Sequence, residues 1–255
     1  VGHRQVVVVD LPENAPSLRM VNGPEVVLAV RIVFFGELIE AADSFDHLGL
    51  RCLGQGGHAH QGAGRGVETV ELALDALDRD VGREYVRKCD MDRAFPYEAY
   101  EKAARLGFHR VLVPEADGGD GGDVFSYALM CEALSAYGVD FSVAIAGGIF
   151  TAMNFSLHGT EDQKQRFLQP FMRGEVRFPI SMSEPGAGSD VANVQTRAEA
   201  DGDHYVLNGQ KLWCSGAANR GAVILMLVRT AQTPDRRDGL SVFIVPNELP
   251  GLTIR

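Results

Sequence analysis

Hydrophobic residues follow a helical spacing between residues 67 and 175. The first run falls on one face of a helix at Val67, Val70, Leu74, Leu77 and Val81. Further helices are predicted to open at Pro96 and to follow an Asp123 cap, ending near Gly107 and Gly138 respectively. An apolar stretch over 141–157 predicts a fourth helix.

The segment 161–173 predicts a further helix with clear boundary signals. Thr160 and Gln163 have the spacing of a capping box, and Gly174 suits a helix end. Pro170 is expected to distort this helix, because proline lacks a backbone N–H and its ring crowds the preceding turn.

The hydrophobic period changes to two after Val176, which is typical of strands. Strands are predicted over 176–182, 222–230 and 240–246, and the final GLTIR is read as the start of another. The Asn208-Gly209 pair between HYVL and QKLW predicts a two-residue hairpin. Helices followed by consecutive antiparallel strands indicate an α+β chain with separate helical and β domains.

Residues 1–66 stand apart from this pattern. Val6 to Val9 and residues 26–35 are candidate strands, and GQGGHAHQGAGRG at 54–66 has the composition of a flexible linker. Neither a dinucleotide loop nor a metal pair at His58 and His60 is favoured, since the βαβ context and a third ligand are lacking. We interpret 1–66 as an atypical N-terminal extension that is either not native or disordered.

Composition narrows the functional classes. The chain has 255 residues, 45% hydrophobic and 23% charged, with a net charge of −10. Such a chain can bury a sizeable core, and its negative charge argues against nucleic acid or an anionic membrane surface as main partner. No stretch predicts a membrane span and no secretory signal is evident. The four cysteines show no CxxC spacing, which favours reduced thiols in a cytoplasmic protein.

The segment VRFPISMSEPGAGSD, residues 176–190, carries the strongest candidate chemistry. Pro185 fixes a backbone torsion, while Gly186 and Gly188 permit conformations that side chains would forbid. The turn could direct backbone N–H groups, with the hydroxyls of Ser183 and Ser189, toward a phosphate or a heterocycle edge. By its turn chemistry alone, it could equally be an ordinary surface turn.

The string SMSEPGAGSD resembles the flavin-binding signature of the acyl-CoA dehydrogenases. HYVLNGQKLWCSGA at 204–217 resembles the second flavin segment of that family, and GTEDQKQRFLQPFMRGE at 159–175 resembles the lead-in to the first. The resemblance runs from about Val67 to Arg255. It implies an N-terminal helical domain at 67–175 and a flavin-binding, antiparallel β-barrel-like middle domain at 176–255, truncated before a C-terminal helical domain.

The resemblance implies FAD as the cofactor and places specific residues around it. Ser183 is expected at the pyrimidine edge of the flavin, and Ser215 is expected near N5. Ser189 is expected nearest the CoA portion of a substrate, or within its own turn. The residues expected to bind the cofactor are Ile180, Ser181, Met182, Ser183, Gly188, Ser189, Trp213, Cys214 and Ser215. No metal is expected.

Three residues in these motifs carry competing interpretations. Trp213 would be a core aromatic residue if the neighbouring motif were ignored. Glu184 could be a general base by residue type, but the resemblance implies a structural role for it. Asp190 is expected to stabilise the turn rather than to act in catalysis.

The implied reaction is α,β-dehydrogenation of an acyl-CoA thioester, with electrons passed to an electron-transferring flavoprotein. The catalytic base is unknown here, since the family carries it as a glutamate on a later helical domain. An acyl-CoA oxidase, a flavin-dependent monooxygenase, or an inactive subunit completed by a partner chain are the alternatives. A homo- or hetero-oligomer is expected. Substrate length stays open: Ala146, Gly147 and Gly148 could leave room for an acyl chain or could pack helices.

Overall fold

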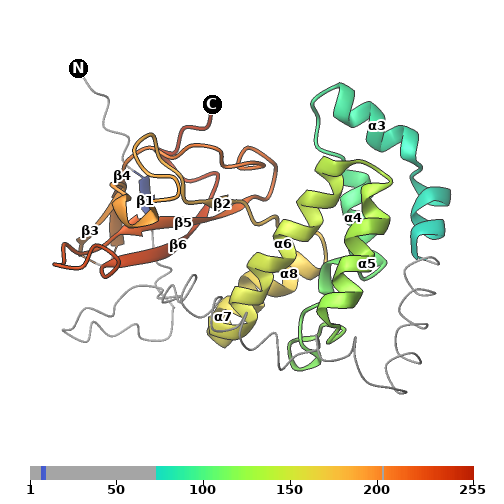
Figure 1. The fold of residues 1–255 in the computed structure, drawn as a ribbon, viewed down its shortest axis with the longest axis horizontal. Helices are drawn as coiled ribbons and strands as arrows, with labels where there is room; N and C mark the ends of the chain where they lie inside the picture. Colours follow the sequence, from blue (N-terminus) through green and yellow to red (C-terminus); the bar gives the residue numbers. More distant parts are fainter. Residues whose placement is uncertain (1–6, 10–72, 203) are drawn as a thin grey trace. The chain divides into compact units, whose positions relative to one another are not determined.

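A computed structural model describes residues 7–9, 73–202 and 204–255 (Figure 1). These residues form two compact units, one containing 7–9 with 177–255 and the other containing 73–176. The expectations for a strand at 26–35, a linker at 54–66 and a histidine pair at 58 and 60 lie outside the described residues. The division of the chain at 66 and 67 also lies outside them.

The unit at 73–176 is helical, as the hydrophobic spacing predicts. Residues 73–80 are helical and lie within the first predicted helix. The labelled elements are α3 (Arg83–Met91), α4 (Tyr97–Arg105), η2 (Phe108–Arg110), η3 (Glu115–Asp117), α5 (Val124–Ser135), α6 (Val139–His158), α7 (Glu161–Gln163), the π-helix η4 (Lys164–Leu168) and α8 (Gln169–Met172). Helix α3 was not predicted, because only Val86 within it is buried.

The predicted helix boundaries rest on side chains that bond the backbone. Asp123 accepts a hydrogen bond from the backbone N–H of Ser126 at 2.8 Å, and so caps α5. Thr160 and Gln163 form the predicted capping box before α7. The distortion expected at Pro170 is a π-helical segment, η4, which ends two residues before the proline.

Large aromatic side chains fill the core of the helical unit. Tyr100, Phe141, Phe155 and Phe171 are fully buried. The ring of His109 packs edge-on to Tyr100, with centroids 4.3 Å apart, and lies 5.2 Å from Phe171. This stacking ties α4 and η2 to α8.

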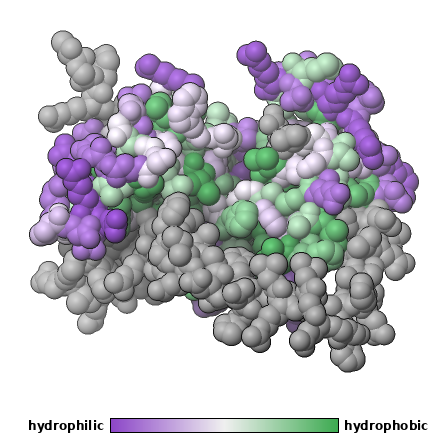
Figure 2. Space-filling model, viewed as in Figure 1, coloured by the Kyte–Doolittle hydropathy of each residue, from purple (hydrophilic) through white to green (hydrophobic). Residues whose placement is uncertain are grey.

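Helix α6 is the one helix among the described residues long and apolar enough to cross a membrane. The qualifying window is Phe141–His158, and half of it is buried inside the protein. Hydrophobic side chains also gather on the surface of the helical unit in the face shown in Figure 2. The exposed ones on α6 are Val143, Phe150 and Leu157, at intervals of seven residues. The buried half is typical of a core helix.

The unit that contains 177–255 is built on one mixed sheet. Its strands are β1 (Val7–Val9), β2 (Ile180–Ser181), β3 (Arg197–Asp201), β4 (His204–Asn208), β5 (Val223–Arg229) and β6 (Leu240–Pro246), in the order β1-β4-β3-β5-β2 with β6 also on β5. The β1–β4, β3–β4 and β5–β6 pairs are antiparallel, whereas β2 and β3 each pair with β5 in parallel.

Strand β5 is the centre of this sheet, and every one of its residues is buried. Strand β6 pairs along its whole length, from Val223 opposite Pro246 to Arg229 opposite Leu240. The parallel partners β2 and β3 therefore share the other edge of β5. Strand β2 pairs with Leu225 and Met226, and β3 pairs with Arg229. The core between strands includes Leu207, Ile224, Met226, Val228, Phe243 and Val245.

Five details of the predicted β domain are wrong. The sheet is not closed into a barrel among the described residues, and its strands are not all antiparallel. The strand predicted at 176–182 is regular only at Ile180–Ser181, and the final GLTIR is not a strand. The hairpin joins β3 to β4 through Gly202 (φ 66°), not through Asn208-Gly209.

Gly209 instead allows a close approach between segments. A Cβ added at Gly209 would lie 2.3 Å from Thr196 Oγ1 and 2.6 Å from Thr196 Cα. This glycine is therefore needed for close packing. The sequence alone does not show whether an Asn-Gly pair forms a turn or allows such packing.

Candidate functional site

The signature at 180–190 runs from strand β2 into a tight turn. The backbone N–H of Glu184 donates to Ala187 O at 2.8 Å, and the N–H of Ala187 donates back to Glu184 O at 3.2 Å. The Asn193 side chain donates to Gly186 O at 3.1 Å, which ties the turn to the following 3-10 helix, η5 (Val191–Asn193). The turn is thus fixed by the protein's own hydrogen bonds.

The glycines of the signature face open space. A Cβ added at Gly186 or Gly188 would meet nothing within 4 Å, and neither has a positive φ. The fold of this unit therefore does not itself require glycine at these two positions. Glycine there leaves the backbone open to close approach by a ligand.

The carboxylate of Glu184 is a buried acceptor for three donors. Its Oε1 accepts from the backbone N–H of Thr196 and from Lys211 Nζ, both at 2.9 Å. Its Oε2 accepts from the backbone N–H of Gln195 at 2.7 Å. These bonds join the signature to the start of β3, which supports the structural role expected for Glu184.

Lys211 is the residue of this site that the sequence did not reveal. Its side chain is 8% exposed and that of Glu184 is 5% exposed. Besides the carboxylate, Lys211 Nζ bonds Met182 O at 3.1 Å. Only the QKLW context of the second segment surrounds it in the sequence, and this context carries no sign of a buried ion pair.

Burial and pairing act in opposite directions on this ion pair. Burial would raise the pKa of Glu184, but hydrogen bonds from Lys211 and from the backbone N–H groups of Gln195 and Thr196 hold that pKa below its usual value. Burial lowers the pKa of Lys211, and the carboxylate of Glu184 opposes this effect. We take the pair as charged, since Glu184 has three converging donors.

The second segment lies directly against the first. The backbone N–H of Leu212 donates to Ser183 O at 2.8 Å, and a turn follows in which Ser215 N–H donates to Trp213 O at 3.0 Å. Trp213 has a positive φ of 60° and is 86% exposed. The core-aromatic interpretation of Trp213 is therefore wrong for this unit.

Alternation along β2 separates the predicted cofactor residues onto two faces. Ser181 is buried, whereas Ile180 and Met182 are half-buried. Because adjacent residues of a strand point to opposite faces, Ile180 and Ser181, the two residues of β2, face opposite sides of the sheet. Ser183, Gly188, Ser189 and Ser215 lie in the turns beyond the strand ends.

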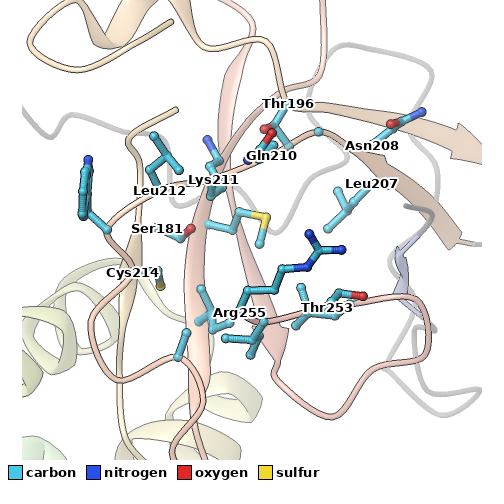
Figure 3. A pocket seen from close by; sticks show the side chains of 17 residues that line it. Ser181, Thr196, Leu207, Asn208, Gln210, Lys211, Leu212, Cys214, Thr253 and Arg255 are labelled. Carbon is cyan, nitrogen blue, oxygen red and sulfur yellow. The ribbon is translucent and has the colours of Figure 1, made fainter. Parts of the chain in front are cut away.

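A cavity of about 760 Å³ opens on the Ser181 side of the sheet (Figure 3). Leu207, Ile224 and Met226 supply its apolar lining, and Gln210 and Lys211 supply polar lining. Of the predicted cofactor residues, only Ser181, Trp213 and Cys214 line this cavity.

The thiol of Cys214 lies inside this lining, beside Ser181. Burial raises the pKa of Cys214, and the Ser181 hydroxyl and the nearby Lys211 lower it by less. This burial suits the thiol, because a free cysteine behaves as a small apolar residue in a protein interior. Among the described cysteines, Cys89, Cys131 and Cys214 are all free.

Arg229 is a second buried cation that the sequence did not single out. It is 6% exposed at the end of β5, and its guanidinium donates hydrogen bonds to backbone carbonyls of two other segments. The acceptors lie in the segment after the signature and in the loop between β5 and β6: Ala192, Val194, Ala231, Arg236 and Asp238. Arg229 therefore fixes both segments to β5.

A helical unit followed by a β unit that carries an exposed, glycine-rich turn and an exposed tryptophan places the chain in the α+β class. Family models support a closer assignment. Residues 68–175 match the acyl-CoA dehydrogenase N-terminal domain, and residues 180–255 match the acyl-CoA dehydrogenase middle domain. The chain belongs to the acyl-CoA dehydrogenase family, as the resemblance of its motifs implied.

Curated relatives agree with this assignment. The chain is 35% identical over 188 residues to the probable acyl-CoA dehydrogenase YngJ of Bacillus subtilis, covering 72% of this chain and 48% of that protein. It is 30% identical to the caffeyl-CoA reductase-Etf complex subunit CarC of Acetobacterium woodii, with the same two coverages. The chain thus spans about half the length of the curated relatives it matches.

Solved structures share the fold. Butyryl-CoA dehydrogenase from Megasphaera elsdenii matches with a TM-score of 0.64 and 26% identity, over 72% of this chain and 48% of the other. A structure described as the electron transferring flavoprotein of Acidaminococcus fermentans matches with a TM-score of 0.66 and 26% identity, with the same coverages. The α+β expectation is confirmed by these matches.

Proposed function

We propose that this chain supplies the flavin platform of an FAD-dependent acyl-CoA dehydrogenase. The observation that carries the proposal is the junction of the two motif segments. Ser183 and Leu212 are hydrogen-bonded, so the signature and the exposed Trp213 lie together on one unit. Family membership and the open backbone at Gly186 and Gly188 add independent support.

The residues present suit a flavin. A bound flavin would accept hydride from the β carbon of the acyl thioester at N5. The half-buried Ser183 would donate to the pyrimidine edge, and Ser215 would donate near N5. Trp213 offers an uncovered indole surface for the ring system. Ser189 is exposed and would lie nearest the CoA portion of the substrate.

The domain limits are part of the same proposal. We assign 67–175 to the helical domain and 176–255 to the flavin-binding domain, with 1–66 as an extension. The matches at 68–175 and 180–255 support these limits. Within 177–255, Gly188 together with Ile180, Met182, Ser183, Ser189, Trp213 and Ser215 remains our proposed cofactor set. Ser181 and Cys214 would support the platform from the cavity side.

Glu184 is not available as the base that removes the α proton. Both its oxygens accept hydrogen bonds from the protein, and Lys211 holds its pKa low. A general base must reach the proton it removes and must bind it readily. We propose that the base comes from residues outside 177–255 or from another chain.

An electron-transferring flavoprotein is the proposed electron acceptor. CarC is named as a subunit of a complex with such a protein, and the Acidaminococcus structure is described as one. An oligomer, and a cytoplasmic location suggested by the free thiols, complete the proposal.

The test compares flavin binding by two glycine variants. Gly188→Ala should leave thermal stability unchanged but lose bound FAD, because its added methyl meets no protein atom and would occupy ligand space. Gly209→Ala is the matched control, since its methyl would clash with Thr196 and lower stability with or without FAD. Wild-type protein that retains no flavin, and is not reduced by any acyl-CoA without air, would refute the proposal. Rapid reoxidation by oxygen would favour an oxidase or monooxygenase.

A further inference from the structure

We propose that Lys211 is a positioning residue that holds the two flavin segments in register. This inference rests on the proposed function and assigns a role to a residue outside the proposed cofactor set. Two segments meet at its ammonium group: the signature, through Met182 O and the Glu184 carboxylate, and the second segment, through Lys211 itself, two residues before Trp213.

The bonding pattern explains why one side chain can control this register. Lys211 Nζ bonds Met182 O and Glu184 Oε1, on either side of Ser183. Ser183 O is in turn bonded by the N–H of Leu212. A displacement of the ammonium group would therefore move Ser183 and the Leu212-Trp213 peptide relative to each other. These are the backbone positions on which the proposed flavin contacts depend.

The environment makes the register stiff. The ion pair is shielded from water on both partners, at 8% and 5% side-chain exposure. Buried charge pairs do not rearrange freely, because an unpaired charge in the interior is strongly disfavoured. Glu184 is also fixed to β3 through the N–H groups of Gln195 and Thr196. Lys211 and Ser181 both lie in the wall of the cavity (Figure 3).

The experiment measures FAD binding to the apoprotein, by quenching of flavin fluorescence, well below the unfolding temperature. Lys211→Met should weaken FAD binding about tenfold or more, the equivalent of losing one strong hydrogen bond, and should shift the visible flavin spectrum. Arg173→Met removes an exposed ion pair to Glu175 of similar length, 2.8 Å, and should change neither reading.

Two further variants keep the inference falsifiable. Lys211→Arg keeps the charge but spreads its donors over a planar fork, so it should retain the fold and still weaken FAD binding. Glu184→Gln combined with Lys211→Met removes both charges, so no buried charge is left unpaired. Compared with Lys211→Met alone, the double variant should recover stability more than FAD affinity. The inference would be wrong if folded Lys211→Arg and the double variant both bound FAD within twofold of wild type and left the flavin spectrum unchanged. The ion pair would then have only a structural role. Wild-type protein that binds no FAD would refute the proposed function and this inference together.

Discussion

Two adjacent glycines in α6 give a sharp test of the helical core. Gly147 and Gly148 are both within the helix, so replacement by alanine gains about the same helix propensity at each, about 1 kcal/mol. Their surroundings differ. A Cβ at Gly147 would meet nothing within 4 Å, whereas a Cβ at Gly148 would lie 2.7 Å from Phe171 Cε2 and 3.1 Å from Cζ.

The magnitude follows from the difference between these sites. Phe171 is 0% exposed and its ring packs against His109, so it has little room to withdraw. Inserting a methyl group into such a core costs about 1–3 kcal/mol. Gly147→Ala should therefore stabilise the protein by up to about 1 kcal/mol, and Gly148→Ala should be about 1–3 kcal/mol less stable than Gly147→Ala, because the propensity gain cancels.

Urea denaturation followed by far-ultraviolet circular dichroism measures this difference in the helical unit. Fluorescence of Trp213, the single tryptophan, follows the β unit separately and should change little in either variant. Equal stability of the two variants, or a more stable Gly148→Ala, would show that α6 and α8 are not packed as described. It would also reopen the alternative that Gly148 leaves room for an acyl chain.

Three further changes have definite expected outcomes. The Ser156 hydroxyl and the Lys164 ammonium hold the pKa of Asp117 below its ordinary 3.8. Asp117→Asn should therefore be less stable than wild type at neutral pH. The difference between the urea midpoints of the two proteins should narrow as the pH falls below 3.8, because the wild-type carboxylate then becomes protonated. Arg229→Met should lower the unfolding free energy by about 2–5 kcal/mol, and lysine at this position should recover only part of it, because five backbone carbonyls lose their charged donor. Asp123→Ala should cost about 1 kcal/mol by thermal melting, since α5 loses its cap.

Local side-chain chemistry explains which parts of the fold were predictable. The caps at Asp123 and Thr160 bond backbone N–H groups three residues away, so their signal lies within four consecutive residues. The error at Gly209 arose because its requirement comes from Thr196, thirteen residues earlier, through close packing. Parallel pairing of β2 and β3 with β5 likewise depends on contacts distant in sequence.

The same distinction applies to the site, where Glu184 was visible in the signature and Lys211 was not. The importance of Lys211 arises only when folding places its ammonium group against Glu184, 27 residues earlier. This contact also explains why a carboxylate can occur in a site proposed for phosphate-bearing ligands. An unpaired Glu184 would repel such anions and would be disfavoured by burial. Paired with Lys211 and two backbone N–H groups, its charge is compensated within the protein, and the carboxylate can fix the turn without opposing the ligand.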